Sequence, residues 1–219
     1  FSFHEVKNIT SFGEGGIVTT TIPGFGPEMK RARFLGLDFT APIKDWLYNI
    51  TPIPGKHHPF VASNYSTTEI QGLGLSLQVR RNEDIVAKRR AAAEYLNRSF
   101  AKCDAILPQL MGDDKTKPTF HMYLLRIDPE KAGGDIQVLK RKLTEKGVTN
   151  IPHFGPLYRF KVVGDMGYDI DAIAKTCPNC EELFYHRFTH LPLYGLDDEQ
   201  MKYMADAVLE AIAEMQANI

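Results

Sequence analysis

Lys7 stands in a setting where a lysine could do covalent chemistry. It lies between a short aromatic segment, Ser2-Phe-His-Glu-Val, and a glycine-rich turn, Gly13-Glu-Gly-Gly16. A lysine amine attacks a carbonyl group only when it is neutral, and burial favours the neutral form. Small residues nearby let a flat cofactor and its phosphate approach the backbone. Lys7 is therefore a candidate Schiff-base lysine, although these features alone also fit a solvated lysine beside a turn.

A second group of reactive residues is Cys177-Pro-Asn-Cys180, with His186 and His190 shortly after it. Paired Cys and His residues are the ligands of structural zinc sites. The gap between the two pairs is much shorter than the roughly 12–15 residues of a zinc finger. We therefore predict no metal site here and interpret the cysteines as packing residues near a helix end.

The composition excludes several classes of protein. The 219 residues include 26 Lys and Arg against 27 Asp and Glu, a formal net charge of −1, which argues against a general basic surface for nucleic acid. No apolar run approaches the roughly 20 residues of a membrane span, and residues 1–20 lack the layout of a signal peptide. Three cysteines suggest a reducing compartment. We expect a cytoplasmic protein that binds neither nucleic acid nor membranes.

The elements that must position these residues alternate in type. Residues 68–219 read as strands and helices in turn, which predicts α/β layering, whereas residues 23–67 read as a long irregular passage. The patterns predict strands over 16–22, 119–127 and 188–193. They predict short helices over 29–36, 136–147 and 169–176, and a long helix from Thr67 or Thr68 to about Ala101 with a kink near Asn82. A last helix is predicted after Asp197, where Asp197 and Gln200 resemble a capping box.

Basic residues cluster on the long helix predicted after Thr68. Their spacing favours a solvated helix face, and binding of a nucleotide diphosphate is the alternative. The cluster comprises Arg80, Arg81, Lys88, Arg89 and Arg90.

The lysine segment resembles the signature of a known family. Its pattern, Ser-Phe-His-x-x-Lys-Asn-Ile-Thr-x-x-Gly-Glu-Gly-Gly, is similar to that of the DegT/DnrJ/EryC1/StrS family of nucleotide-sugar and aminocyclitol aminotransferases. Segments 63–71, 147–158 and 177–194 resemble three further family motifs in the same order. The resemblance implies an α/β protein of PLP-dependent fold type I, where PLP is pyridoxal 5'-phosphate. Residues 1–67 would end the large PLP-binding domain and form interface loops, and residues 68–219 would form the small C-terminal domain.

The resemblance also implies roles for individual residues. Lys7 would bind the cofactor covalently and carry the catalytic proton, and Ser2 would hydrogen-bond the PLP phosphate. Asn64 would reach the phosphate of the neighbouring subunit's cofactor, which implies a homodimer with active sites across its interface. His153 would lie near the substrate. Ser66 stands where the family often has arginine, which leaves one contact of that interface or substrate site open.

The implied reaction is transfer of an amino group from glutamate or glutamine to a nucleotide-linked keto-sugar or a keto-cyclitol. A non-catalytic regulatory member that binds PLP or sugar is the alternative, and a dehydratase of the same fold is disfavoured because Lys7 would then typically be histidine. In the family, the acid that pairs with the pyridine nitrogen precedes the lysine. We therefore expect that the chain needs a separate N-terminal half, or is part of a longer enzyme, for efficient catalysis.

Overall fold

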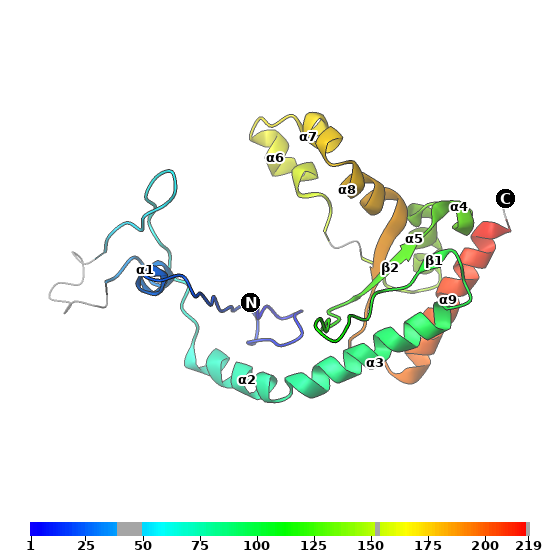
Figure 1. Ribbon diagram of the computed structural model, residues 1–219, viewed down its shortest axis with the longest axis horizontal. Helices are drawn as coiled ribbons and strands as arrows, with labels where there is room; N and C mark the ends of the chain where they lie inside the picture. Colours follow the sequence, from blue (N-terminus) through cyan, green and yellow to red (C-terminus); the bar gives the residue numbers. More distant parts are fainter. Residues whose placement is uncertain (39–49, 152–153, 218–219) are drawn as a thin grey trace. The chain divides into compact units, whose positions relative to one another are not determined.

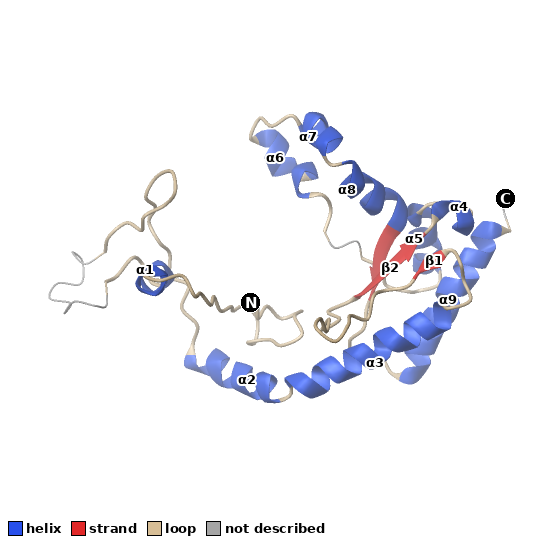
Figure 2. Cartoon of the chain, in the orientation of Figure 1, coloured by secondary structure: helices blue, strands red, loops and turns tan. Residues whose placement is uncertain are grey.

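The computed structural model describes residues 1–38, 50–151 and 154–217 (Figure 1). The chain divides into two compact units, Phe1–Asn82 and Glu83–Ile219. The first unit consists mainly of loops, whereas the second contains the sheet and most of the helices (Figure 2). No helix among the described residues combines the length and the apolar character needed to cross a bilayer.

The long helix predicted after Thr68 is confirmed, as two consecutive helices. Helix α2 spans Glu69–Arg80 and α3 spans Asn82–Phe100, so the predicted kink is a break at Arg81. Thr68 caps α2, and its side chain and that of Gln71 form a reciprocal capping box. The short helix predicted over 29–36 is α1, which spans Phe25–Arg33.

The strand predicted over residues 16–22 is wrong. Gly16 forms an isolated bridge with Ser2, and Ile17 exchanges hydrogen bonds with Phe1, but residues 18–22 are exposed and form no strand. A β-branched run becomes a strand only where another strand satisfies its backbone and its side chains are packed. Among the described residues of the first unit, nothing pairs with this run beyond Ile17.

The second unit contains a three-stranded antiparallel sheet in the order β1-β2-β3. Its strands are β1 (Ile106–Leu107), β2 (Tyr123–Ile127) and β3 (Phe188–Leu191). The predictions for the last two are confirmed with shorter bounds, whereas β1 is too short to show a periodic signal. Tyr123, Leu125 and Ile127 are buried and Leu124 is exposed, so β2 packs one face against the core.

The described part of the second unit also contains six further helices, some of which pack on the buried face of the sheet. They are α4 (Pro129–Ala132), α5 (Ile136–Glu145), α6 (Lys161–Asp165), α7 (Ile170–Thr176), α8 (Pro178–Glu182) and α9 (Asp198–Gln216), with a 3-10 turn at Leu157–Arg159 and a π-helical turn at Leu183–Arg187. The predicted α5, α7 and α9 are confirmed, and Asp197 and Gln200 form the predicted capping box. Apolar side chains of α3, α5, α9 and the sheet form one core, which includes Leu96, Phe100, Leu139, Leu143, Val208 and Ile212.

Two arginines of the basic cluster point inward, contrary to the predicted solvated face. Arg89 is 4% exposed, donates to the carbonyl oxygens of Phe120 and His121, and lies 5.2 Å from the ring centre of Tyr194. Arg90 donates to the carbonyl oxygens of Pro118 and Met111. Burial lowers the pKa of Arg89. Both guanidinium groups thus donate hydrogen bonds to backbone carbonyl oxygens of the loop between β1 and β2. The spacing of basic residues along the sequence does not reveal this role.

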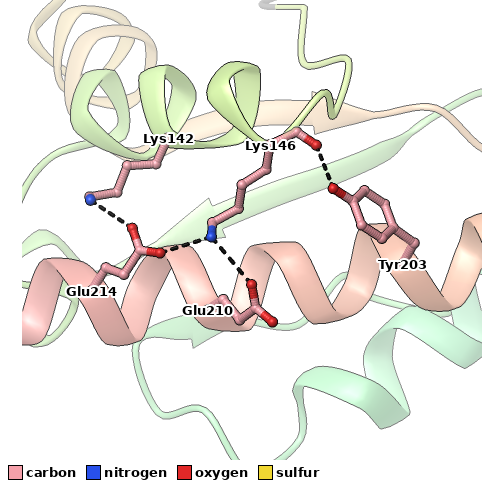
Figure 3. A network of polar contacts seen from close by, with 5 residues as sticks. All are labelled: Lys142, Lys146, Tyr203, Glu210 and Glu214. Carbon is pink, nitrogen blue, oxygen red and sulfur yellow. Dashed lines mark hydrogen bonds and ion pairs between the residues drawn. The ribbon is translucent and has the colours of Figure 1, made fainter.

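A network of charged side chains joins α5 to α9 (Figure 3). Glu214 on α9 accepts hydrogen bonds from Lys142 and from Lys146, both at 2.8 Å, and Lys146 also contacts Glu210 at 3.2 Å. The Tyr203 hydroxyl donates to the backbone carbonyl oxygen of Lys146 at 2.8 Å. Hydrogen bonds from Lys142 first, and then from Lys146, lower the pKa of Glu214 to about 2.

We expect Glu214→Gln to lower the thermal unfolding midpoint by a few degrees at pH 7. The pKa of Glu214 in the folded protein lies below its ordinary value of 4.5. The network's contribution to the stability of the fold is therefore complete above about pH 4.5 and is lost as the pH falls toward 2. The difference between wild type and E214Q should therefore shrink below pH 4.5, and salt should reduce it. Glu94→Gln, a change of an exposed residue on α3, is the control. Equal midpoints for E214Q and wild type at pH 7 would show that the network contributes nothing.

Candidate functional site

Lys7 lies on a closed loop of residues 1–17, here called the lysine loop. The backbone N–H of Phe3 donates to the carbonyl oxygen of Gly15 at 2.8 Å, and the N–H of Ser11 donates to that of Phe3 at 3.0 Å. The bridge between Ser2 and Gly16 closes the base of the loop. These bonds join residues far apart along the loop, so its backbone path is fixed by its own hydrogen bonds.

The Lys7 side chain emerges, half-buried, from a turn that His4 braces. The backbone N–H of Lys7 donates to the carbonyl oxygen of His4 at 3.0 Å. The imidazole of His4 accepts from the N–H of Val6 at 3.3 Å through Nδ1, and its Nε2 lies 3.2 Å from a carboxylate oxygen of Glu14. His4 thus links the two sides of the loop, a structural role that directs the chain on either side of Lys7.

Ser2 is on the same loop, at its base. Its Oγ accepts the backbone N–H of His4 at 3.4 Å, and the residue is exposed. A hydroxyl oxygen that accepts one hydrogen bond still has its proton to donate to an anion. The structure therefore brings the predicted phosphate ligand and the predicted catalytic lysine onto one short, closed segment.

Asn64 lies on a different segment of the first unit, beside the residues that follow α1. It bridges to Phe34, and its neighbour Tyr65 donates its N–H to the carbonyl oxygen of Arg33 at 2.8 Å. The side-chain Oδ1 of Asn64 accepts the N–H of Ser66 at 2.9 Å. Since the oxygen serves this local turn, the Nδ2–H groups are the part of the amide suited to an anionic ligand.

Gly15 allows a close approach where the lysine loop closes on itself. A Cβ at Gly15 would lie 2.2 Å from Oγ of Ser11. Ser11 is buried, and its hydroxyl contacts the carbonyl oxygens of Phe3 at 3.3 Å and Glu14 at 3.0 Å. A lysine amine, a serine hydroxyl and a close-packed backbone suit a cofactor with an aldehyde and a phosphate. The residues present therefore fit PLP.

Helix α2 supports the lysine loop through two contacts that the sequence does not predict. Gln71 donates from Nε2 to the carbonyl oxygen of Glu14 at 3.0 Å while it also completes the cap of α2. The ring of Phe12 lies against Gly74, where a Cβ would be 2.0 Å from Cε2 of the ring. Gln71 belongs to a segment that resembles a family motif, but no local pattern connects Phe12 with Gly74.

Two further predictions concern other parts of the chain. His153, the predicted substrate residue, lies outside the described residues. Among the described residues, no group of three or more His, Cys, Asp or Glu side chains is arranged to hold a metal ion.

Comparisons with known proteins identify the fold. A protein of Streptococcus pneumoniae described as a sugar aminotransferase, Spr1654, in its PMP form, matches 99% of this chain with a TM-score of 0.78 and 20% identity. DesV of S. venezuelae matches 97% of the chain with a TM-score of 0.74 and 22% identity. PseC of Helicobacter pylori, an aminotransferase involved in the biosynthesis of pseudoaminic acid, matches 98% with a TM-score of 0.73 and 20% identity.

The chain spans about half the length of these structures, since it covers 51% of Spr1654, 50% of DesV and 53% of PseC. The predicted fold class, α/β of PLP-dependent fold type I, is confirmed by these matches. Spr1654 is known in PLP and PMP forms, which agrees with the predicted cofactor, pyridoxal phosphate.

The sequence comparison extends over almost the whole chain. Residues 1–209 match one family model, and the match includes the lysine loop, the Asn64 segment and most of the second unit. The family suggested by the four motifs is thereby confirmed: the chain belongs to the DegT/DnrJ/EryC1/StrS aminotransferase family.

Proposed function

We propose that this chain supplies the part of a PLP-dependent active site that contains the catalytic lysine, Lys7. The reaction is transfer of an amino group from glutamate or glutamine to a nucleotide-linked keto-sugar or a keto-cyclitol. One observation carries the proposal: Ser2 and Lys7 share a closed loop that Gln71 fastens to α2. Family membership supports amino transfer as the reaction class, and two of the similar structures are described as a sugar aminotransferase and as an aminotransferase of pseudoaminic acid biosynthesis.

The residues of this chain have two roles in the proposed reaction, which are to hold the cofactor and to move a proton. PLP, when bound, supplies the electron sink and carries the amino group between the two substrates. Nζ of Lys7 would hold the cofactor covalently and would serve as the base that moves the catalytic proton. The Ser2 hydroxyl donates to the phosphate. The contacts of His4 with Val6, Lys7 and Glu14 would hold the turn that carries Lys7.

We assign Asn64 to the cofactor of a second copy of the chain, so that the active site lies across a homodimer interface. The local turn that occupies its Oδ1 supports this role, because Nδ2 remains as the phosphate donor. Helix α2 supports it as well, since Ile70, Leu73 and Leu77 form an apolar stripe and are 73%, 66% and 49% exposed. An exposed apolar stripe of this kind is typical of a protein interface.

The remaining assignments follow the family resemblance. Residues 1–67 belong to the end of the large PLP-binding domain, residues 68–219 to the small domain, and His153 to the substrate site. Three free cysteines fit the proposed cytoplasmic location.

Because the chain spans about half the length of the similar structures, we also propose that efficient turnover needs the polypeptide corresponding to their other half. The 219-residue chain alone should show little transaminase activity, and addition of the complementary polypeptide should restore it. A robust rate from the chain alone would contradict this proposal. The assay is formation of 2-oxoglutarate from glutamate in the presence of a keto-sugar acceptor.

Borohydride trapping tests the proposed function on the native assembly, purified through a tag on this chain. Borohydride should fix the cofactor on the peptide that contains Lys7, as peptide mass spectrometry would show. Prior incubation with glutamate or glutamine should prevent fixation, because an amino donor displaces Lys7. A non-catalytic binder would remain fixable after the donor is added, and a cofactor fixed on another lysine would overturn the assignment of Lys7.

A further inference from the structure

Two cysteines of the second unit lie one helical turn apart. Cys177 is the single residue between α7 and α8, and Cys180 lies in the first turn of α8. The backbone N–H of Cys180 donates to the carbonyl oxygen of Cys177 at 3.0 Å. Such a turn keeps its end Cα atoms within about 7 Å, and disulfides span Cα distances of about 4.4–6.8 Å. Cys177 itself is not helical, with a φ of −122° and a ψ of 47°, so the backbone hydrogen bond of the turn is what keeps the two residues close.

Both thiols are free and accessible, which a reactive pair requires. Cys180 is exposed and Cys177 is partly exposed, so the interpretation of both cysteines as packing residues is wrong for Cys180. The hydroxyl of Thr176 lies 3.7 Å from Sγ of Cys177. The remaining cysteine, Cys103, is also free but packs against the hydrophobic core. Cys103 can therefore serve as an internal control for the reactivity of the Cys177–Cys180 pair.

Cys180 adjoins a polar cluster that ties the 3-10 turn Leu157–Arg159 to α8. The Tyr158 hydroxyl donates to the Glu181 carboxylate at 2.5 Å and also interacts with the Cys180 thiol. Arg159 makes a two-pronged contact with the same carboxylate, at 2.6 and 3.2 Å. The hydrogen bond to Glu181 is the main cause that raises the pKa of Tyr158. Hydrogen bonds from Arg159 first, and then from Tyr158, lower the pKa of Glu181. The Cys180 thiol thus lies beside the hydroxyl that joins this turn to α8.

We propose that Cys177 and Cys180 form a reversible intramolecular disulfide when the protein meets a peroxide. The exposed Cys180 thiolate attacks one oxygen of hydrogen peroxide, the O–O bond breaks, and the products are a sulfenic acid and hydroxide, which takes up the thiol proton as water. The Cys177 thiolate then attacks the Cys180 sulfur, and the departing hydroxide leaves as a second water with the Cys177 proton. Overall, two thiols lose two electrons and two protons, and peroxide becomes two waters. A dithiol reductant reverses the change by thiol–disulfide exchange.

The alternative use of such a pair is metal binding, which needs further ligands. Among the residues that the structure describes, no third His, Cys, Asp or Glu completes a metal group with these cysteines. A disulfide needs only the two sulfurs already present.

Limited oxidation of the native assembly, purified through a tag on this chain, tests the proposal. After treatment with hydrogen peroxide and alkylation of remaining thiols, mass spectrometry should find the peptide with Cys177 and Cys180 lighter by two hydrogens and unalkylated. The pair should be lost at least about ten times faster than the Cys103 thiol, and dithiothreitol should restore it. Cys103→Ser should leave the disulfide unchanged. Cys177→Ser should instead leave Cys180 as a sulfenic acid that a dimedone probe captures.

A second measurement shows whether the fold brings the sulfurs together. In a dithiothreitol redox titration, the equilibrium constant for the Cys177–Cys180 disulfide should be at least about tenfold larger in the folded chain than in urea. Circular dichroism checks that each serine variant is folded. The proposal is overturned if the pair oxidises no faster than Cys103, if oxidation proceeds to sulfinic acid without a disulfide, or if urea leaves the equilibrium constant unchanged.

Discussion

Replacement of Lys7 with alanine should lower kcat for amino transfer in the native assembly by at least ~10³-fold. The variant loses both the covalent anchor of the cofactor and the base that moves the proton. The lysine loop should nevertheless keep its shape, because its closing bonds are made by the backbone and by Ser11 and His4, not by the Lys7 side chain. Thermal unfolding of K7A should therefore match that of the wild type, while borohydride should no longer fix the cofactor on this chain.

Lys30→Ala is the matched control for this experiment. Lys30 belongs to the same unit, lies on α1 and is exposed. Its replacement should leave kcat and cofactor fixation unchanged. If K7A retained wild-type turnover, or if K30A lost as much activity as K7A, Lys7 would not be the catalytic lysine.

Gly74→Ala should reduce kcat/KM by about 10²-fold without lowering stability. The new Cβ would lie 2.0–2.7 Å from three atoms of the Phe12 ring, so the ring must move. Phe12 is in the lysine loop at a φ of 59°, where the backbone has little freedom to adjust. The loop should therefore shift relative to α2, and Lys7 with it. Alanine itself favours the helix, so the unfolding midpoint should not fall.

Gly72→Ala provides the control from the same helix. No atom lies within 4 Å of a Cβ added at Gly72, so the substitution should raise helix stability by about 0.5–1 kcal/mol and leave kcat/KM unchanged. Steady-state kinetics on the native assembly and thermal unfolding of each variant measure the two effects separately. Equal kcat/KM for G74A and G72A would show that the contact with Phe12 does not position the lysine.

The elements that were predicted well are those whose signals are local in the sequence. The capped starts of α2 and α9 depend on residues three positions apart, and the apolar stripes of α5 and α9 repeat within a few turns. The strand predicted over 16–22 was wrong because a strand also needs a partner, which propensity alone does not supply. The two-residue strand β1 was missed because so short a segment has no period.

The same distinction applies to the candidate site. The residue types and spacing around Lys7, together with the order of four motifs, were sufficient to identify the family and the cofactor. The tertiary structure alone showed that Phe12 rests on Gly74, that Gln71 holds the carbonyl of Glu14, and that Arg89 faces inward. Each of these contacts joins residues 31 to 62 positions apart. Helix caps and reactive residue types can be recognised from neighbouring sequence positions. Contacts between distant residues depend instead on which surfaces pack together once the chain has folded.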